Sequence, residues 1–257
     1  MTLPAGDTLL LKLVLTPGLI AAASLAGRRW GQAVGGWLVG LPLTSGPVAF
    51  FLALDHGAGF AAAASFGSLA GAIAEVAFCL AYGRVADRGW PLALVAACVA
   101  FAVVAAAVQP LALGLLGLAA LVVVTLMLAL RCLPGRPGAG AAGTPPRWDI
   151  PARMAVTTGL VVALTETAPV LGPRLSGVLA TFPVYAAILT VFAHRAGSPA
   201  AVQVLRGLLV GLLSFAGFFV ALGGLIERLG VAGGFVAATA AALVIQAASF
   251  ALVRTPA

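Results

Sequence analysis

The sequence predicts an all-α integral membrane protein, a polytopic bundle of about nine transmembrane helices with two four-helix repeats of inverted topology. Of its 257 residues, 62% are hydrophobic and 8% are charged, and the mean hydropathy is +1.15. Soluble domains have roughly 45–50% apolar and about 25% charged residues. The apolar runs are long and apolar on all sides, so they predict helices and not the alternating strands of a membrane barrel.

Uncharged runs of about 18 or more residues are long enough to cross the hydrocarbon core of a bilayer. Nine such spans are predicted, at residues 9–26, 33–54, 59–82, 91–108, 111–130, 154–171, 175–193, 207–226 and 231–253. The fourth and fifth are separated only by Gln109 and Pro110. The region from Pro91 to Leu130 is too long for one helix and fits two.

The basic residues test this division, because cytoplasmic loops of membrane proteins carry the excess of Lys and Arg. With nine spans, one side of the membrane holds three cations, Lys12, Arg174 and Arg228. The other side holds eleven: Arg28, Arg29, Arg84, Arg88, Arg131, Arg136, Arg147, Arg153, Arg195, Arg206 and Arg254. Merging the fourth and fifth spans would give six against eight. The bias therefore favours nine spans, with the N-terminus outside and the C-terminus in the cytoplasm.

The composition also limits the location and the partners. One lysine against thirteen arginines, with abundant alanine and glycine, favours a bacterial genome rich in G and C, and hence the bacterial inner membrane. The lipid bilayer is the expected partner, and homo-oligomers stay possible. The basic residues are scattered over many short loops, so the net charge of +7 does not indicate a nucleic-acid surface.

A shift of the sequence against itself by 141 residues aligns residues that carry backbone constraints. The aligned pairs include Thr16 with Thr157, Gly18 with Gly159, Gly31 with Gly172, Gly36 with Gly177 and Pro42 with Pro183. At a shift of 140 the match continues with Gly57 and Gly197, Gly67 and Gly207, Gly71 and Gly211, and Asp87-Arg88 and Glu227-Arg228. This self-similarity predicts a duplication.

The duplication divides the chain into three parts. Residues 1–108 form the first four-helix repeat and residues 154–257 the second. Between them, residues 109–153 supply one linking helix and a cytoplasmic linker rich in Gly, Pro and Arg. The linking helix is a fifth crossing after four, so the second copy is predicted to be inverted relative to the first.

The stretch GLPLTSGPVAF, residues 40–50, places two prolines inside the second span. Proline cannot donate a backbone hydrogen bond, so this span is predicted to be broken or strongly kinked. Interrupted helices at matching places in two inverted halves indicate a binding site near the membrane midplane. The predicted substrate-binding residues are Pro42, Thr44, Ser45, Gly46, Pro47, Thr181, Pro183 and Tyr185. The alternative is that Gly36, Gly40, Gly67 and Gly71 only allow close helix packing.

Two acidic residues lie inside predicted spans, where an ionised group costs roughly 2.5–3.5 kcal/mol on insertion scales. Glu75 lies near the middle of the third span and Glu166 past the middle of the sixth, between two threonines. Neither is repeated in the other half. Both are candidates for coupling proton movement to transport. The alternative for each is a protonated carboxyl that is hydrogen-bonded to a neighbouring helix.

The stretch SGVLATFPVYAAIL, from Ser176 to Leu189, resembles the second helix of the small GlpM-like bacterial inner-membrane proteins. Gly177, Phe182 and Pro183 are the matching positions, and Gly36 and Pro42 match in the first half, where Leu41 replaces the Phe. The resemblance implies a fused, inverted pair linked to export of envelope polysaccharide. The general plan is also similar to the drug/metabolite transporter superfamily, which has two inverted halves of five helices.

The leading functional prediction is a small secondary transporter or flippase-like carrier of a small molecule or lipid-linked envelope precursor. The alternative is a non-catalytic membrane subunit or scaffold of an envelope or polysaccharide export complex. A lipid-modifying enzyme has the least support, because no catalytic motif such as G-x-S-x-G or H-E-x-x-H is present. The three cysteines have no C-x-x-C spacing, so no zinc site is expected, and no cofactor is predicted.

Overall fold

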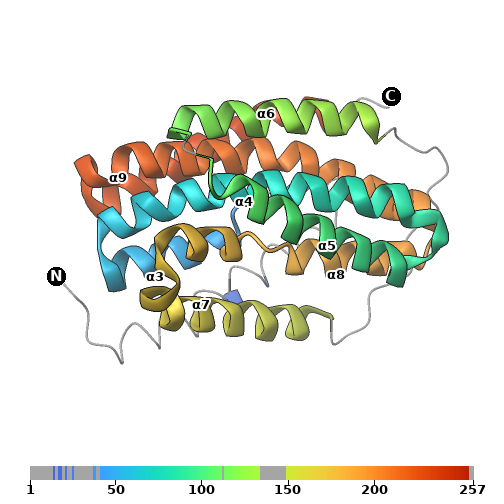
Figure 1. Ribbon diagram of the computed structural model, residues 1–257, viewed down its shortest axis with the longest axis horizontal. Helices are drawn as coiled ribbons and strands as arrows, with labels where there is room; N and C mark the ends of the chain where they lie inside the picture. The colour runs from blue at the N-terminus through green and yellow to red at the C-terminus, as the bar shows by residue number, and fades with distance from the viewer. Residues whose placement is uncertain are drawn as a thin grey trace.

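The structure, a computed structural model, describes residues 41–111, 113–133 and 149–254, with residues 14, 17, 18, 21, 25, 37 and 38 before them. All regular structure in these ranges is helical (Figure 1). The elements are α3 (Ser45–His56), α4 (Ala58–Val85), the short 3-10 helix η1 (Ala86–Arg88), α5 (Trp90–Val108), α6 (Leu115–Cys132), α7 (Asp149–Ala180), α8 (Val184–His194) and α9 (Ser198–Arg254). The predicted all-α class is confirmed for the described part of the chain.

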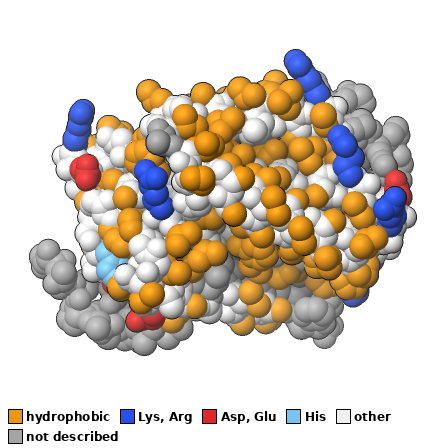
Figure 2. Space-filling model, viewed as in Figure 1, with side chains coloured by type: hydrophobic (Ala, Val, Ile, Leu, Met, Phe, Trp, Pro, Cys, Tyr) orange, Lys and Arg blue, Asp and Glu red, His pale blue; other side chains and the backbone are white. Residues whose placement is uncertain are grey.

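Five of these helical stretches are long and apolar enough to cross a membrane, by length and composition. They are Ala58–Arg88, Trp90–Val108, Leu115–Cys132, Ile150–Ala180 and Ser198–Ser249. The outward faces of α5, α6 and the last part of α9 carry large exposed apolar side chains, such as Val95, Leu116 and Val236. Charged side chains gather mainly toward the two ends of the long axis (Figure 2). These features are compatible with a multi-pass protein in contact with lipid.

The predicted set of nine separate helices is not reproduced, since the described ranges contain seven α-helices. Predicted spans four and five are separate helices, α5 and α6. Spans six and seven meet inside α7 at Gly172, and spans eight and nine meet inside α9 at Gly230. Both glycines have left-handed φ angles, 74° and 71°, so the chain changes direction at one residue without a loop. The first predicted span, 9–26, lies outside the continuously described ranges.

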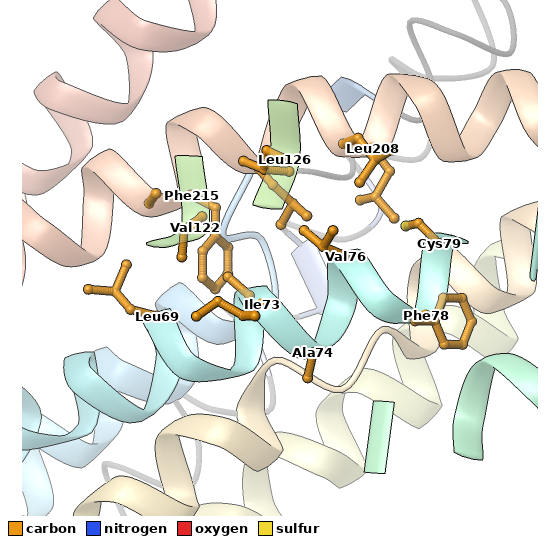
Figure 3. Close-up of a cluster of buried hydrophobic side chains, with 14 of the residues drawn as sticks. Leu69, Ile73, Ala74, Val76, Phe78, Cys79, Val122, Leu126, Leu208 and Phe215 are labelled. Atoms are coloured by element: carbon orange, nitrogen blue, oxygen red, sulfur yellow. The ribbon is translucent and has the colours of Figure 1, made fainter. Parts of the chain in front are cut away.

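The centre of the bundle is an antiparallel pair formed by α4 and the first part of α9. At one end, the Ser198 hydroxyl donates a hydrogen bond of 2.6 Å to the Asp87 carboxylate. At the other end, Glu227 lies against Gly59. Helix α6 packs across both helices of the pair, and side chains of all three interlock, among them Ile73, Val122 and Phe215 (Figure 3). This core buries α4 on nearly every side.

Helix α4 also crosses the end of α7 with backbone against backbone. A Cβ atom built on Gly67 would overlap the carbonyl group of Arg174, and one on Gly177 would overlap the carbonyl of Ala64. One turn along α4, a Cβ on Gly71 would overlap the side chain of Thr181. Small residues allow this approach, which dispersion contacts then stabilise because lipid provides no hydrophobic driving force between helices. The contact brings Thr181 to within one turn of Glu75.

Two structural patterns recur at the shift seen in the sequence. In α5 the buried residues are Ala93, Ala97, Phe101, Ala105 and Val108, and in the last part of α9 they are Gly234, Ala238, Ala242, Gln246 and Ser249, each 141 positions later. Glycines with positive φ also pair, Gly57 with Gly197 at a shift of 140 and Gly89 with Gly230 at a shift of 141. Helix α4 and the first part of α9, which the predicted repeat aligns with each other, run in opposite directions. The pattern of buried positions thus recurs between α5 and the last part of α9, and the duplication of a whole four-helix unit stays a prediction.

One arginine caps the linking helix. The guanidinium of Arg206 in α9 donates hydrogen bonds to the carbonyl oxygens of Leu130, at 3.2 Å, and Leu133. Both carbonyls belong to the end of α6, where the last turn has no partners within its own helix. A cation there also interacts favourably with the helix dipole. The contact fixes the end of α6 to the second half of the chain.

The glycine crossing predicts the effect of a single methyl group. Gly67→Ala forces α4 away from α7, so we expect destabilisation by about 1–3 kcal/mol, the usual effect of overpacking. Gly117→Ala is the matched control, because its Cβ would lie 3.6 Å from the nearest atom, an ordinary contact. There alanine is expected to be neutral or stabilising by up to about 1 kcal/mol. Thermal unfolding in detergent measures both, and a Gly67→Ala protein as stable as wild type would contradict the crossing.

The native cysteines test the predicted orientation. Cys132 is exposed at the end of α6, whereas Cys79 is buried and Cys98 is partly buried within α5. A membrane-impermeant maleimide should therefore label Cys132 in inside-out vesicles and leave it unlabelled in intact spheroplasts. Cys132→Ser should abolish the signal. Labelling from the outside would reverse the orientation that the positive charges predict.

Candidate functional site

The bundle contains two short non-helical segments, and each includes a proline that the sequence analysis assigns to the binding site. The first, Leu41–Thr44, precedes α3, and the second, Thr181–Pro183, lies between α7 and α8. Pro47 falls in the first turn of α3, where its missing N–H has no intrahelical partner to lose. Pro42 and Pro183 lie 141 positions apart, so the interruptions occupy equivalent places in the two predicted repeats.

Short local hydrogen bonds satisfy the backbone at both interruptions. The Gly46 amide donates to the Pro42 carbonyl at 2.8 Å, and the Ala187 amide donates to the Pro183 carbonyl at 2.8 Å. Each proline thus accepts a bond from the helix that restarts after it. The Thr181 hydroxyl donates to the Val178 carbonyl at 2.6 Å. The segments are therefore ordered turns, as backbone without water must be.

The two interruptions meet at one small polar cavity, which we call the central pocket. It has a volume of about 30 Å³ and is lined by Leu41, Leu43, Thr44, Ser45, Glu75, Thr181, Phe182, Pro183, Val184, Ala186, Leu212 and Phe215. Several lining residues are pairs under the predicted repeat, including Glu75 with Phe215 and Ser45 with Ala186. The central pocket thus lies between the halves. Its size suits about one or two water molecules.

Glu75 is the acidic residue of the central pocket. Its side chain is 6% exposed, and it lies on α4 one turn after Gly71. Among the described residues, no hydrogen bond or ion pair reaches its carboxyl group. An ionised carboxylate without a partner is unfavourable in a low-dielectric interior. The group is therefore suited to bind a proton, or to release it when a cationic or hydrogen-bonding group enters.

Glu166 lies elsewhere. It is exposed on the first part of α7, whose buried face packs through Val161 and Leu164 against α3. The neighbouring hydroxyls of Thr165 and Thr167 donate to carbonyls of their own helix, at 2.9 Å to Val161 and 2.7 Å to Ala163. The structure therefore does not bring Glu166 to the central pocket, and the flanking threonines do not form a polar site around it.

The other predicted residues divide between two cavities. Thr44, Ser45, Thr181 and Pro183 line the central pocket. Pro42, Gly46 and Pro47 line a neighbouring apolar cavity, together with Leu41, Leu43, Phe50, Phe218, Phe235, Thr239, Ala242 and Leu243. The side chain of Tyr185 lies outside the described part of the structure. Sequence reasoning missed Leu41, Leu43 and Phe215, because apolar residues in an apolar chain give no signal.

A second polar contact lies toward the end of α4. Tyr82 is fully buried two turns after Glu75, with Cys79 between them on the same helical face. Its hydroxyl lies 3.1 Å from Nδ1 of His194, at the end of α8. Burial lowers the pKa of His194 from its ordinary 6.5, while the negative charge of Asp87 raises it. When Nδ1 of a neutral His194 carries no proton, it can accept a hydrogen bond from the Tyr82 hydroxyl.

No three His, Cys, Asp or Glu side chains in the described ranges lie close enough together to hold a metal ion. The apolar wall and the single carboxyl of the central pocket suit binding and proton exchange. Comparison with known proteins adds no assignment, since no family model, curated protein or solved structure matches the chain.

The environment of His194 predicts a pH dependence. Because its pKa is lower in the folded protein than the ordinary 6.5, the unfolded chain takes up a proton first as the pH falls. The contribution of this group to stability is thus complete above pH 6.5 and is lost as the pH falls through the folded-state pKa. We expect His194→Gln to flatten the fall in unfolding temperature between about pH 8 and pH 5. Asp87→Asn removes the negative charge that raises the pKa of His194, so titration by NMR should show a lower pKa for His194 in this variant. A higher pKa would contradict this account.

Proposed function

We propose that the chain is a small secondary transporter or flippase-like carrier in which Glu75 couples substrate movement to protons. One observation carries the proposal: two non-helical segments, one from each half, line the same small pocket beside a buried carboxyl to which no residue of the described ranges makes a hydrogen bond or ion pair. Carriers built from inverted repeats place their sites at such interruptions. The GlpM-like resemblance and the inner-membrane location remain part of the proposal.

The physical support is the position of the irregular backbone. Within a membrane, non-helical backbone is tolerated only where protein or a water-filled cavity surrounds it. A chain selected only for stability would use continuous helices. Here each half has an interruption at an equivalent position of the predicted repeat, and both interruptions contribute residues to the central pocket. The arrangement supports a binding role.

The mechanism follows from the size of the central pocket. A volume of about 30 Å³ is far below the roughly 300–1,000 Å³ of ordinary ligand sites. The described conformation is therefore closed around the site, and substrate enters when the halves move apart on one side. Alternating access of this kind is largely rigid-body movement of one repeat against the other. Glu75 takes up a proton when substrate leaves and gives it up when substrate binds.

A route for that proton runs along α4. Glu75, Cys79 and Tyr82 follow one another at helical spacings of four and three residues, and Tyr82 contacts His194. The positive-inside rule places this end of α4 in the cytoplasm. Tyr82 and His194 would then connect the central pocket to the cytoplasmic side, with water completing the gaps between side chains.

Transport by purified protein tests the proposal. In proteoliposomes with an imposed pH gradient, we expect uptake or flipping of at least one compound from a panel of radiolabelled amines, amino acids, sugars and fluorescent lipids. Glu75→Gln keeps the shape of the side chain and removes the exchangeable proton. It should reduce gradient-driven movement to the level of protein-free liposomes, while the variant unfolds at a temperature similar to wild type.

Two further variants sharpen the result. Glu227→Gln, at a helix end, is the matched control and should retain movement. Glu166→Gln separates the two predicted carboxyls: loss of coupling in this variant alone would assign the role to Glu166 and contradict the assignment to Glu75. If no compound moves in any preparation, while the protein co-purifies with an export complex, the scaffold alternative replaces the carrier.

A further inference from the structure

The apolar cavity beside the central pocket is about ten times larger than that pocket. Its volume is about 320 Å³, roughly twice that of an engineered apolar cavity of about 150 Å³ that binds benzene. Thr239 supplies the one polar side chain of its lining. Leu41 and Leu43 line both this cavity and the central pocket, so the two spaces adjoin across the first interruption. We call this space the side cavity.

A difference between the two repeats explains why the side cavity exists. The ring of Phe101 in α5 packs against the ring of Phe182, with ring centroids 5.2 Å apart and planes at 89°. The positions 141 residues away from these two are Ala242 and Leu41, and both line the side cavity. Alanine in place of phenylalanine removes the ring that fills the equivalent space.

Contacts on both sides of Ala242 keep this space from collapsing. Toward one end, the rings of Phe50 and Phe235 pack edge to face at 5.2 Å. Toward the other end, Gln246 donates a hydrogen bond of 2.9 Å to the Trp37 carbonyl, and Trp37 donates one of 2.9 Å to Ser249. The last part of α9 is thus held at a fixed distance from the segment around α3, and Ala242 is too short to cross it.

The side cavity opens toward the lipid-facing surface. Leu243, one of its lining residues, is 57% exposed, and Val236 and Val244 on the same helix are 71% and 69% exposed. Where the surroundings are hydrocarbon and the walls are apolar, water is a poor occupant and a hydrocarbon chain is a good one. A molecule that enters from the bilayer would reach Leu41 and Leu43, and beyond them the polar groups around Glu75.

We propose that the side cavity holds the hydrocarbon part of the carried substrate, an amphiphile whose small polar group reaches the central pocket beside Glu75. This inference rests on the proposed carrier function and narrows its substrate class from any small molecule to a compound with a lipid-like chain. The polar group must be small and able to donate a hydrogen bond or a positive charge, because the central pocket offers carboxyl, hydroxyl and carbonyl oxygens.

Photo-cross-linking tests the occupant directly. The probe is a long-chain alkylamine with a diazirine in its chain, incorporated into proteoliposomes of the wild-type protein. After illumination, mass spectrometry should find the label enriched on residues 41–50 and 235–243, above the level on the exposed face of α5. Ala242→Phe supplies the ring that Phe101 supplies in the other repeat and should reduce this label to the α5 level. Ala240→Phe, the same change on the exposed face of α9, should leave the enrichment intact.

An even distribution of label, or enrichment that survives Ala242→Phe, would overturn the proposal, because the chain would then touch only the outer surface. Ala242→Leu serves as the second variant if the phenylalanine protein unfolds, and it should lower the enrichment partially. Glu75→Gln separates this inference from the carrier function: it should abolish gradient-driven movement and keep the label. Movement of a chain-free solute that Ala242→Phe leaves unchanged would reject the amphiphile and retain the carrier.

Discussion

The lipid bilayer cannot form hydrogen bonds with backbone groups, and this constraint organises the rest of the structure. The non-helical segments around Pro42 and Pro183 carry backbone polar groups that need partners within the protein. The two interruptions therefore meet at the central pocket, where residues of α4 and of the first part of α9 complete the lining. Because the same enclosure surrounds Glu75, the constraint that hides irregular backbone also creates a polar interior in an apolar molecule.

Close approach is the second requirement of this enclosure. The α4–α9 pair and the overlying α6 provide the apolar core, but the second interruption reaches α4 only because glycines face it. With Gly71 and Gly177 at the contact, Thr181 lies beside α4 and completes the wall of the central pocket. Packing and polar chemistry are thus joined at one crossing, and the glycines that could be explained as packing alone also position the site.

Much of the fold was predictable, because hydrophobicity and proline act locally. The separation of α5 from α6, the interruptions near Pro42 and Pro183, and the place of Glu75 inside a long helix all follow from residues next to one another in the sequence. The turns at Gly172 and Gly230 were expected as loops, since a positive φ angle leaves no mark beyond a glycine among many. Glu75 and Glu166 looked equivalent, because which face of a helix is buried depends on its neighbours.

The backbone crossing at Gly67 and Gly177 has a mechanical consequence. Between most helices, side chains can change rotamer and absorb a small displacement. At this crossing no side chain separates the backbones of α4 and α7. The first half of the protein and the second touch rigidly at this point, so neither can slide there without breaking the contact. If one half turns on the other, as the proposed carrier mechanism requires, this crossing is the natural pivot, and the two ends of the bundle would then move farthest.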